Sequence, residues 1–316
     1  MKLFFFVLLS CICPLPLVAQ NDLSSLFADS ETEKSRLPVI ATFKSPWIIN
    51  GQSNETIYKN DLLFVVKHRF GDLAGGNGGL KTFFGLDNST DILIGFEYGL
   101  SNQWSIGLGR AKGAPNGVST FQRQLFYVDT KYRLLHQTVD DHVPVSVSLF
   151  GNAVVSTMEK IDLATSDASF QKFSDRMSYV AQVIVTRKFS DKLSLALSPT
   201  YVRRNYVSFQ DMNNLFALGI GSRIKFSRRM ALVVDYVISF RSQESQDYFL
   251  DQHEFEFYNP LGVGLEIETG GHVFNLSFTN STAILENQFI PATSSSWTDG
   301  EFRWGFSITR TFTLKD

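Results

Sequence analysis

The sequence alternates between apolar and polar residues with a period of two in about a dozen separate stretches. In residues 125–134, Asp129, Lys131 and Arg133 all fall on odd positions, while the even positions are mostly apolar. Successive side chains of a strand point to opposite faces, whereas a helix would spread these three charges around its axis. The chain therefore builds strands whose two faces meet different environments.

This alternation predicts twelve strands, at residues 61–70, 90–99, 103–111, 123–135, 143–153, 176–188, 192–203, 214–226, 229–240, 259–268, 272–280 and 301–313. The connections between them alternate in length. Short ones fall at 100–102, 136–142, 189–191, 227–228 and 269–271, and long ones lie between them. An even number of strands with this alternation is typical of an all-β, up-and-down antiparallel transmembrane β-barrel, with short periplasmic turns and long outer loops. The alternative, a soluble β-sandwich, predicts Greek-key connections without such a rhythm.

Composition excludes two other classes of protein. The 316 residues are 44% hydrophobic, yet the mean hydropathy is −0.02, because apolar and polar residues are finely mixed. No stretch after the N-terminus approaches the roughly 18 apolar residues that a spanning helix needs. The 29 basic residues are matched by 31 acidic ones, a balance that disfavours nucleic acid as a partner.

The N-terminus predicts export. Lys2 precedes an apolar run, and Ala19 precedes a polar stretch, so residues 1–19 are interpreted as a signal peptide. A buried helix, or a lipoprotein signal ending at Cys11, are the alternatives. Cys11 and Cys13 both lie in this leader, so the cleaved chain has no thiol. We expect the mature protein in the outer membrane of a Gram-negative bacterium.

The remaining chain divides into two parts. Residues 20–60 are interpreted as an N-terminal periplasmic segment that acts as a tether, a plug of the lumen or an extra strand. Residues 61–316 form the barrel.

The alternation also assigns side chains to the two faces of the barrel. The charged residues predicted to line the lumen, as a pore lining or a lattice of salt bridges, are Lys67, Arg69, Asp91, Glu97, Asp129, Lys131, Arg133, Arg223, Lys225, Asp235, Glu266, Glu268 and Arg303. Aromatic residues beside the short turns are predicted to form a girdle at one membrane interface. They are Tyr98, Trp104, Tyr132, Phe189, Phe226 and Phe312.

Several stretches resemble a known family. They include residues 42–45, 48–53, 68–71, 83–87 and 94–100, and residues 199–202 fit as well. Together they are similar to a domain-of-unknown-function β-barrel family of Bacteroidetes outer membranes, over roughly residues 38–316. The resemblance implies fold and location, and it supplies no catalytic residues.

Chemical motifs are weak in this sequence. The five histidines show no metal-ligand spacing on a helix, and the glycine-rich stretch 75–79 lacks the Lys-Ser of a phosphate loop, so we interpret it as a flexible outer loop. Glu266 and Glu268 share one strand face, where a catalytic pair is less favoured than a structural or pore-lining role. His136 and His142 lie near two aspartates without an obvious serine partner.

Three hypotheses of function follow. The first is a narrow pore or channel for small solutes with a charged lumen. The second is a closed structural or binding barrel that acts through its outer loops, and the third, less favoured, is an outer-membrane enzyme. We expect a protein that is not an enzyme and has no cofactor or metal. Its expected partners are outer-membrane lipids, the barrel-assembly machinery and a small solute.

Overall fold

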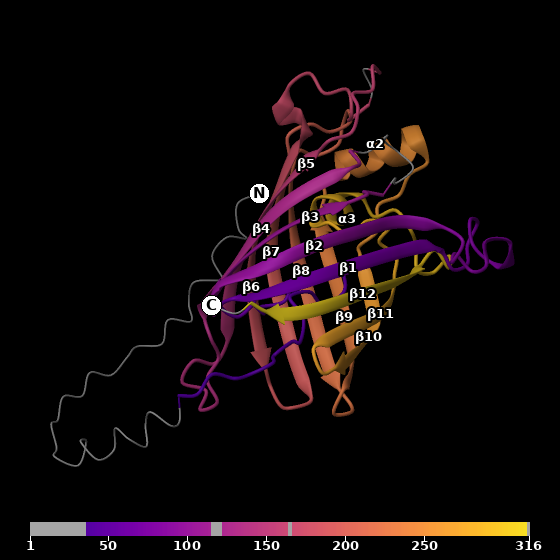
Figure 1. Cartoon of the computed structure of the whole chain (residues 1–316). Helices are drawn as coiled ribbons and strands as arrows, with labels where there is room; N and C mark the ends of the chain where they lie inside the picture. The colour runs from indigo at the N-terminus through magenta and orange to yellow at the C-terminus, as the bar shows by residue number, and fades with distance from the viewer. Residues whose placement is uncertain (1–35, 115–121, 164–165, 315–316) are drawn as a thin grey trace, which may run out of the picture.

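The computed structural model describes residues 36–114, 122–163 and 166–314, which leaves the predicted signal peptide outside the described residues. Within these ranges, strands form a closed barrel in which each strand pairs with its neighbours in sequence and β1 pairs with β12 (Figure 1). The strands are β1 (Asp61–Asp72), β2 (Ser89–Ser101), β3 (Trp104–Ala111), β4 (Leu125–Leu135), β5 (Ser146–Ser156), β6 (Met177–Lys188), β7 (Leu193–Arg204), β8 (Asn214–Lys225), β9 (Met230–Phe240), β10 (Leu261–Thr269), β11 (His272–Thr279) and β12 (Arg303–Thr313). All pairs are antiparallel. The predicted fold class and the twelve predicted strands are confirmed, each boundary to within three residues.

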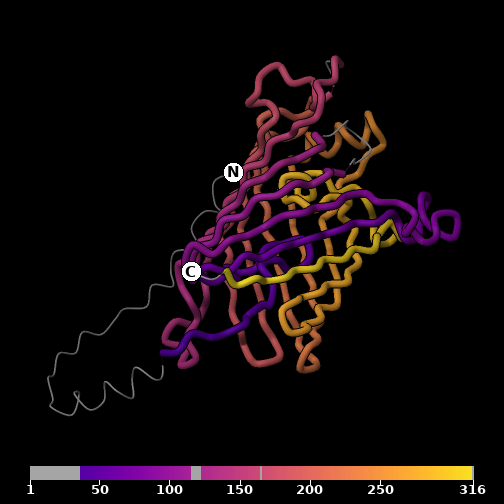
Figure 2. Tube along the Cα trace, viewed as in Figure 1, coloured from indigo at the N-terminus to yellow at the C-terminus, as the bar shows by residue number. Residues whose placement is uncertain are grey.

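The connections give the barrel two different ends, which we call the turn end and the loop end. Short turns close one end, and long loops extend from the other (Figures 1 and 2). The loops contain elements that the alternation did not predict: the helices α2 (Gln243–His253) and α3 (Glu286–Ala292) and the 3-10 helices η1 (Leu80–Thr82) and η2 (Phe173–Arg176). In the described part of the chain, no helix is both long enough and apolar enough to cross a membrane.

The two faces of the wall differ as the alternation requires. On β8, the side chains of Leu215 and Ala217 are 1% and 4% exposed, whereas those of Phe216 and Ile220 are 63% and 44% exposed. The first pair faces the lumen and the second faces outward. An outward apolar belt of this kind is what lipid requires of a barrel wall.

Two segments fill the lumen. Residues 42–57, which we call the lumen segment, lie mostly buried inside the barrel and precede β1. Residues 280–302, which we call the lumen loop, connect β11 to β12 and fold inward with α3 almost wholly buried. The interior is therefore packed with chain as well as with wall side chains.

Candidate functional site

The lumen segment is fastened to the wall by one buried carboxylate. Asp235 on β9 is 2% exposed, and its Oδ2 accepts the backbone N–H groups of Ile49, Asn50 and Gly51 at 3.0, 2.6 and 2.8 Å. Its Oδ1 accepts the Nδ2 of Asn50 at 2.9 Å. Three successive N–H groups turned toward one anion form a concave nest. A tight turn creates this nest, because the N–H of Ile48 donates to the carbonyl of Gly51 at 2.8 Å.

Cations of the wall also bind the segment through its backbone and side-chain oxygens. Lys131 donates to the carbonyl of Pro46 at 2.9 Å, and Arg133 donates to that of Asn54 at 3.4 Å. Arg69 donates to the Oδ1 of Asn50 at 2.9 Å. These contacts occupy charges that otherwise would stand unpaired in a closed interior, where an isolated ion is very costly.

Further contacts of the segment use side chains. The ammonium of Lys67 lies 4.3 Å from the centre of the Trp47 ring, a cation–π arrangement. Lys44 forms a salt bridge of 2.9 Å with Glu268, and both of these side chains are about one third exposed.

Inward glycines make room for the segment on β8 and β10. A Cβ at Gly221 would lie 2.2 Å from the Cδ1 of Ile48, and one at Gly262 would lie 2.9 Å from the Cγ2 of Ile49. Glycine has no Cβ, so the backbone of the lumen segment can approach the strand closely. These inward glycines are the feature of the sequence from which a lumen filled by the lumen segment could have been predicted.

The other predicted lumen residues lie inside the barrel with different partners. Arg223 and Glu266 form a buried salt bridge of 2.7 Å. Asp91 accepts the N–H groups of Gly113 and Ile284, both at 2.9 Å, and Arg303 donates to Ser295 at 2.7 Å.

Three predicted residues are left. Glu97 is buried, and its Oε2 has no hydrogen-bond partner among the described residues. Asp129 and Lys225 are half-buried. The predicted lattice is therefore only partly a lattice of wall charges bound to each other, because many of these charges bind the lumen segment or the lumen loop. Their role in a pore stays a prediction.

The lumen loop crosses the interior and packs on both walls. Ile284 and Leu285 belong to an apolar cluster with residues of β1 to β5. Phe289 and Ile290 of α3 belong to another cluster with residues of β6 to β9, such as Val237. The loop thus separates the lumen into a part toward the turn end and a part toward the loop end.

Arg241, which follows β9, ties this loop to the rim. It donates to the carbonyl of Pro291 at 2.6 Å and to Asp211 at 2.7 Å, and its guanidinium lies 3.8 Å from the centre of the Phe257 ring. Burial alone would raise the pKa of the Asp211 carboxyl, but Arg204 and Arg241 hold that pKa below its ordinary value of 3.8. Asp211 is thus a charged bridge between two arginines.

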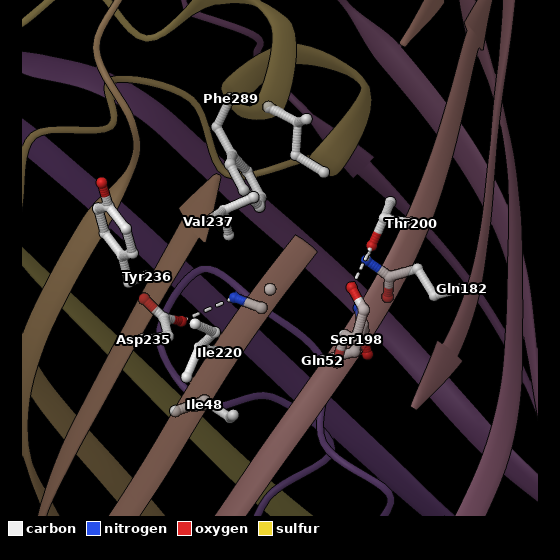
Figure 3. A pocket seen from close by; sticks show the side chains of 14 residues that line it. Ile48, Gln52, Gln182, Ser198, Thr200, Ile220, Asp235, Tyr236, Val237 and Phe289 are labelled. Atoms are coloured by element: carbon white, nitrogen blue, oxygen red, sulfur yellow. Dashed lines mark hydrogen bonds between the residues drawn. The ribbon is translucent and has the colours of Figure 1, made fainter. Parts of the chain in front are cut away.

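Two cavities follow each other along β9, the first lined by apolar and polar side chains and the second mostly by polar groups. The first is small, about 20 Å³, and is lined by the lumen segment, α3 and polar wall residues. Figure 3 shows Gln182 and Thr200 on one side of this cavity, Asp235 on the other, and Phe289 above them. The second cavity, about 120 Å³, opens toward the loop end and is lined by Ser239, Arg241, Tyr258, Asn259 and other residues.

Ile290 borders both cavities. Val237 lines the first and Ser239 the second, and these are consecutive inward positions of β9. We call the first cavity the inner cavity and the second the outer cavity. The inner cavity is also lined by two acceptors without a partner among the described residues, the Oε1 atoms of Gln52 and Gln182. Such buried acceptors are sites for water or for a solute hydroxyl or amine.

The predicted girdle residues all lie at or near the turn end. Trp104, Tyr132, Phe189, Phe226 and Phe312 are 40–60% exposed, and Trp104 and Tyr132 contact each other edge to face at 6.5 Å. Tyr98 is half-buried and donates to Asn60. Their role at a membrane interface stays a prediction.

Of the two histidines considered for catalysis, His136 is engaged in other contacts. The Nε2 of His136 lies 2.9 Å from the carbonyl oxygen of Val39, and its Nδ1 lies 3.4 Å from Arg133. Burial and the charge of Arg133 lower the pKa of His136. Among the described residues, no group of three His, Cys, Asp or Glu side chains is placed to hold a metal ion.

Comparison with solved structures finds other barrels. The NanC porin aligns with 80% of this chain and 100% of its own, at 10% identity and a TM-score of 0.45. The KdgM porin aligns with 80% and 99%, at 8% identity and a TM-score of 0.45. An outer membrane channel from Pseudomonas putida F1 aligns with 82% and 98%, at 11% identity and a TM-score of 0.45.

No curated protein sequence matches the chain. A family model does, and it is described as a membrane-bound β-barrel domain (DUF5777). It matches residues 43–312, so it covers the lumen segment and the lumen loop as well as the strands. The family resemblance seen in the sequence is thereby confirmed, while the bacterial group stays a prediction. The chain belongs to the family of membrane-bound β-barrel domains.

Proposed function

We propose that this protein is an outer-membrane channel for small polar solutes, closed in this structure by the lumen segment and the lumen loop. In the outer membrane, the turn end would face the periplasm and the loop end would face outward, as is usual for such barrels. Insertion would then use the barrel-assembly machinery.

One observation carries the proposal. Two cavities lie in line along β9, and Ile290 of α3 lines both of them. An apolar constriction is a known means of gating, because a narrow apolar passage expels water. Movement of α3 away from β9 would join the outer cavity to the polar wall of Gln182, Ser198 and Thr200.

The solutes would be small and polar. The inner cavity holds little more than one water in this closed state. Its lining offers amides and hydroxyls, and its one charged group, Asp235, is already bonded to the lumen segment. The lining therefore favours neutral solutes that form hydrogen bonds.

Single-channel conductance in planar bilayers tests the proposal. We expect a small or infrequent conductance from the wild type and a larger or more frequent one from the double variant Phe289→Ala, Ile290→Ala. Ile284→Ala is the matched control, because this residue is a buried apolar side chain of the same loop on the opposite wall. It should leave the conductance near that of the wild type.

The controls decide between the two main hypotheses. Folding of each variant is checked by faster migration of unheated than of boiled samples in gels. If the wild type and the double variant both fold and both lack conductance at every salt concentration, the channel is excluded. The protein is then a closed barrel that acts through its loops.

A further inference from the structure

The loop between β1 and β2 exposes an unusual number of large apolar side chains. Leu80, Phe83, Phe84 and Leu86 are 83%, 61%, 43% and 41% exposed. The loop projects sideways from the loop end, farther from the barrel than the neighbouring loops in this view (Figures 1 and 2). Exposed apolar side chains in a contiguous group usually mark an interaction surface.

The backbone holds these side chains in a defined shape. Residues 75–79 lie in this loop, as the sequence predicts, and the flexibility expected of them stays a prediction. The N–H of Gly79 donates to the carbonyl of Leu73 at 3.0 Å, and the N–H of Gly71 donates to that of Gly85 at 2.9 Å. The N–H of Leu73 donates to the carbonyl of Phe302 at 2.8 Å. This bond fixes the β1–β2 loop to the end of the lumen loop. Gly71 and Gly85 permit the close approach of their two backbone segments.

The conformation of the two phenylalanines is unfavourable by itself. Phe83 and Phe84 have φ angles of 47° and 53°, in the left-handed region that bulky residues rarely adopt. The next residue, Gly85, has φ 84°, and a Cβ there would lie 2.3 Å from the carbonyl oxygen of Gly71. A strained backbone that turns two aromatic rings outward indicates that the exposed rings have a use.

The surface beside the loop indicates what the rings contact. Phe70 lies on the outward face of β1 just before the loop, and its ring centre is 6.1 Å from that of Phe306 on β12. His68 stacks on Phe306 at 5.5 Å. These rings belong to the lipid-facing wall, so the apolar loop continues the established lipid surface of the barrel.

We propose that the β1–β2 loop is a membrane anchor that places Leu80, Phe83, Phe84 and Leu86 among the lipids of the leaflet at the loop end. The loop carries few charges, since Lys81 and Asp87 are the only ionisable residues in 73–88. The ammonium of Lys81 is turned back to the carbonyl of Gly76. The anchor requires the membrane barrel and is independent of whether the barrel conducts.

Tryptophan fluorescence in lipid vesicles tests the anchor. The full chain carrying Phe84→Trp, and separately Leu80→Trp, is reconstituted in phosphatidylcholine vesicles with or without bromine on the acyl chains. Leu80 lies in a 3-10 helix, so its variant does not depend on the left-handed backbone. We expect the new emission, relative to the parent with its four tryptophans, to shift to shorter wavelength and to be quenched by bromine.

Leu163→Trp is the control, because Leu163 is 53% exposed on the β5–β6 loop, which rises away from the barrel (Figure 1). Its emission should resist the bromine. The proposal is overturned if, in folded protein, the emission of both anchor variants resists bromine as much as the emission of Leu163→Trp does. It is also overturned if their emission changes only with protein density in the vesicle, because a second copy of the chain then covers the loop.

Discussion

The two segments that fill the lumen both pack on apolar residues of the wall, but they differ in their contacts with charged groups. The lumen segment is bound by charges and hydrogen bonds, above all by Asp235 and the wall cations. The lumen loop presses Phe289 and Ile290 on an apolar wall and is tied at its rim by Arg241. Directional bonds fix one arrangement, whereas apolar contacts are non-directional and tolerate repacking. The comparison indicates a fixed lumen segment and a lumen loop that moves more readily.

The strongest test of this comparison is removal of the carboxylate. Asp235→Ala leaves three buried N–H groups without their acceptor, and the loss of one partner from such a buried charged site costs on the order of 3–5 kcal/mol. We expect fast hydrogen exchange at residues 48–51 in Asp235→Ala. Mass spectrometry on protein in lipid vesicles measures it.

The matched control is Glu268→Ala, which breaks the half-exposed bridge to Lys44 and should cost less than about 1 kcal/mol. Equal exchange in both variants would show that the nest around Asp235 is not what fixes the lumen segment.

The next test concerns the rim. Arg241→Met keeps much of the apolar stem over Phe257 but removes the bonds to Pro291 and Asp211. We expect the docking of the lumen loop to weaken by roughly 2 kcal/mol, with faster exchange at 286–293 and unchanged exchange at 48–51. Arg203→Met is the control, because Arg203 is exposed and bonds only to Asn214 among the described residues. If hydrogen exchange at residues 48–51 also becomes faster in Arg241→Met, the lumen segment and the lumen loop open together.

Acid should loosen the lumen loop. Arg204 and Arg241 hold the pKa of Asp211 below 3.8, so the stability that this carboxylate contributes is complete above that value and is lost as the pH falls through its lowered pKa in the folded protein. Trp297, whose indole donates to the carbonyl of Leu261 at 3.2 Å, is a fluorescent reporter in the loop.

We expect its emission to change below about pH 4 and the change to be absent in Asp211→Asn, which is loosened at every pH. The same acid transition in Asp211→Asn would assign it to another group.

The sequence was sufficient for the wall and not for what fills it. Period-two alternation and the alternation of connection lengths are local patterns, so they placed the strands and turned Lys131, Arg133 and Asp235 inward. Nothing local says that these charges bind residues 46–54, because such contacts join positions 79 to 185 residues apart in the chain. Likewise, α3 is short and contains Pro291, so its helical pattern is too brief to recognise.

The last test asks whether the two segments are coupled where they meet. The Nε2 of Gln52 donates to the Oε1 of Glu286 at 2.8 Å, and both side chains are buried. A double-mutant cycle with Gln52→Ala and Glu286→Gln, read from hydrogen exchange in each segment, measures this coupling. We expect a coupling of roughly 1 kcal/mol, smaller than the effects at Asp235 and Arg241, because the cycle measures one hydrogen bond between segments that are each anchored elsewhere. Each single variant should then loosen mainly its own segment. A coupling several times larger, with both segments opening in either variant, would mean that the lumen segment and the lumen loop leave the lumen together.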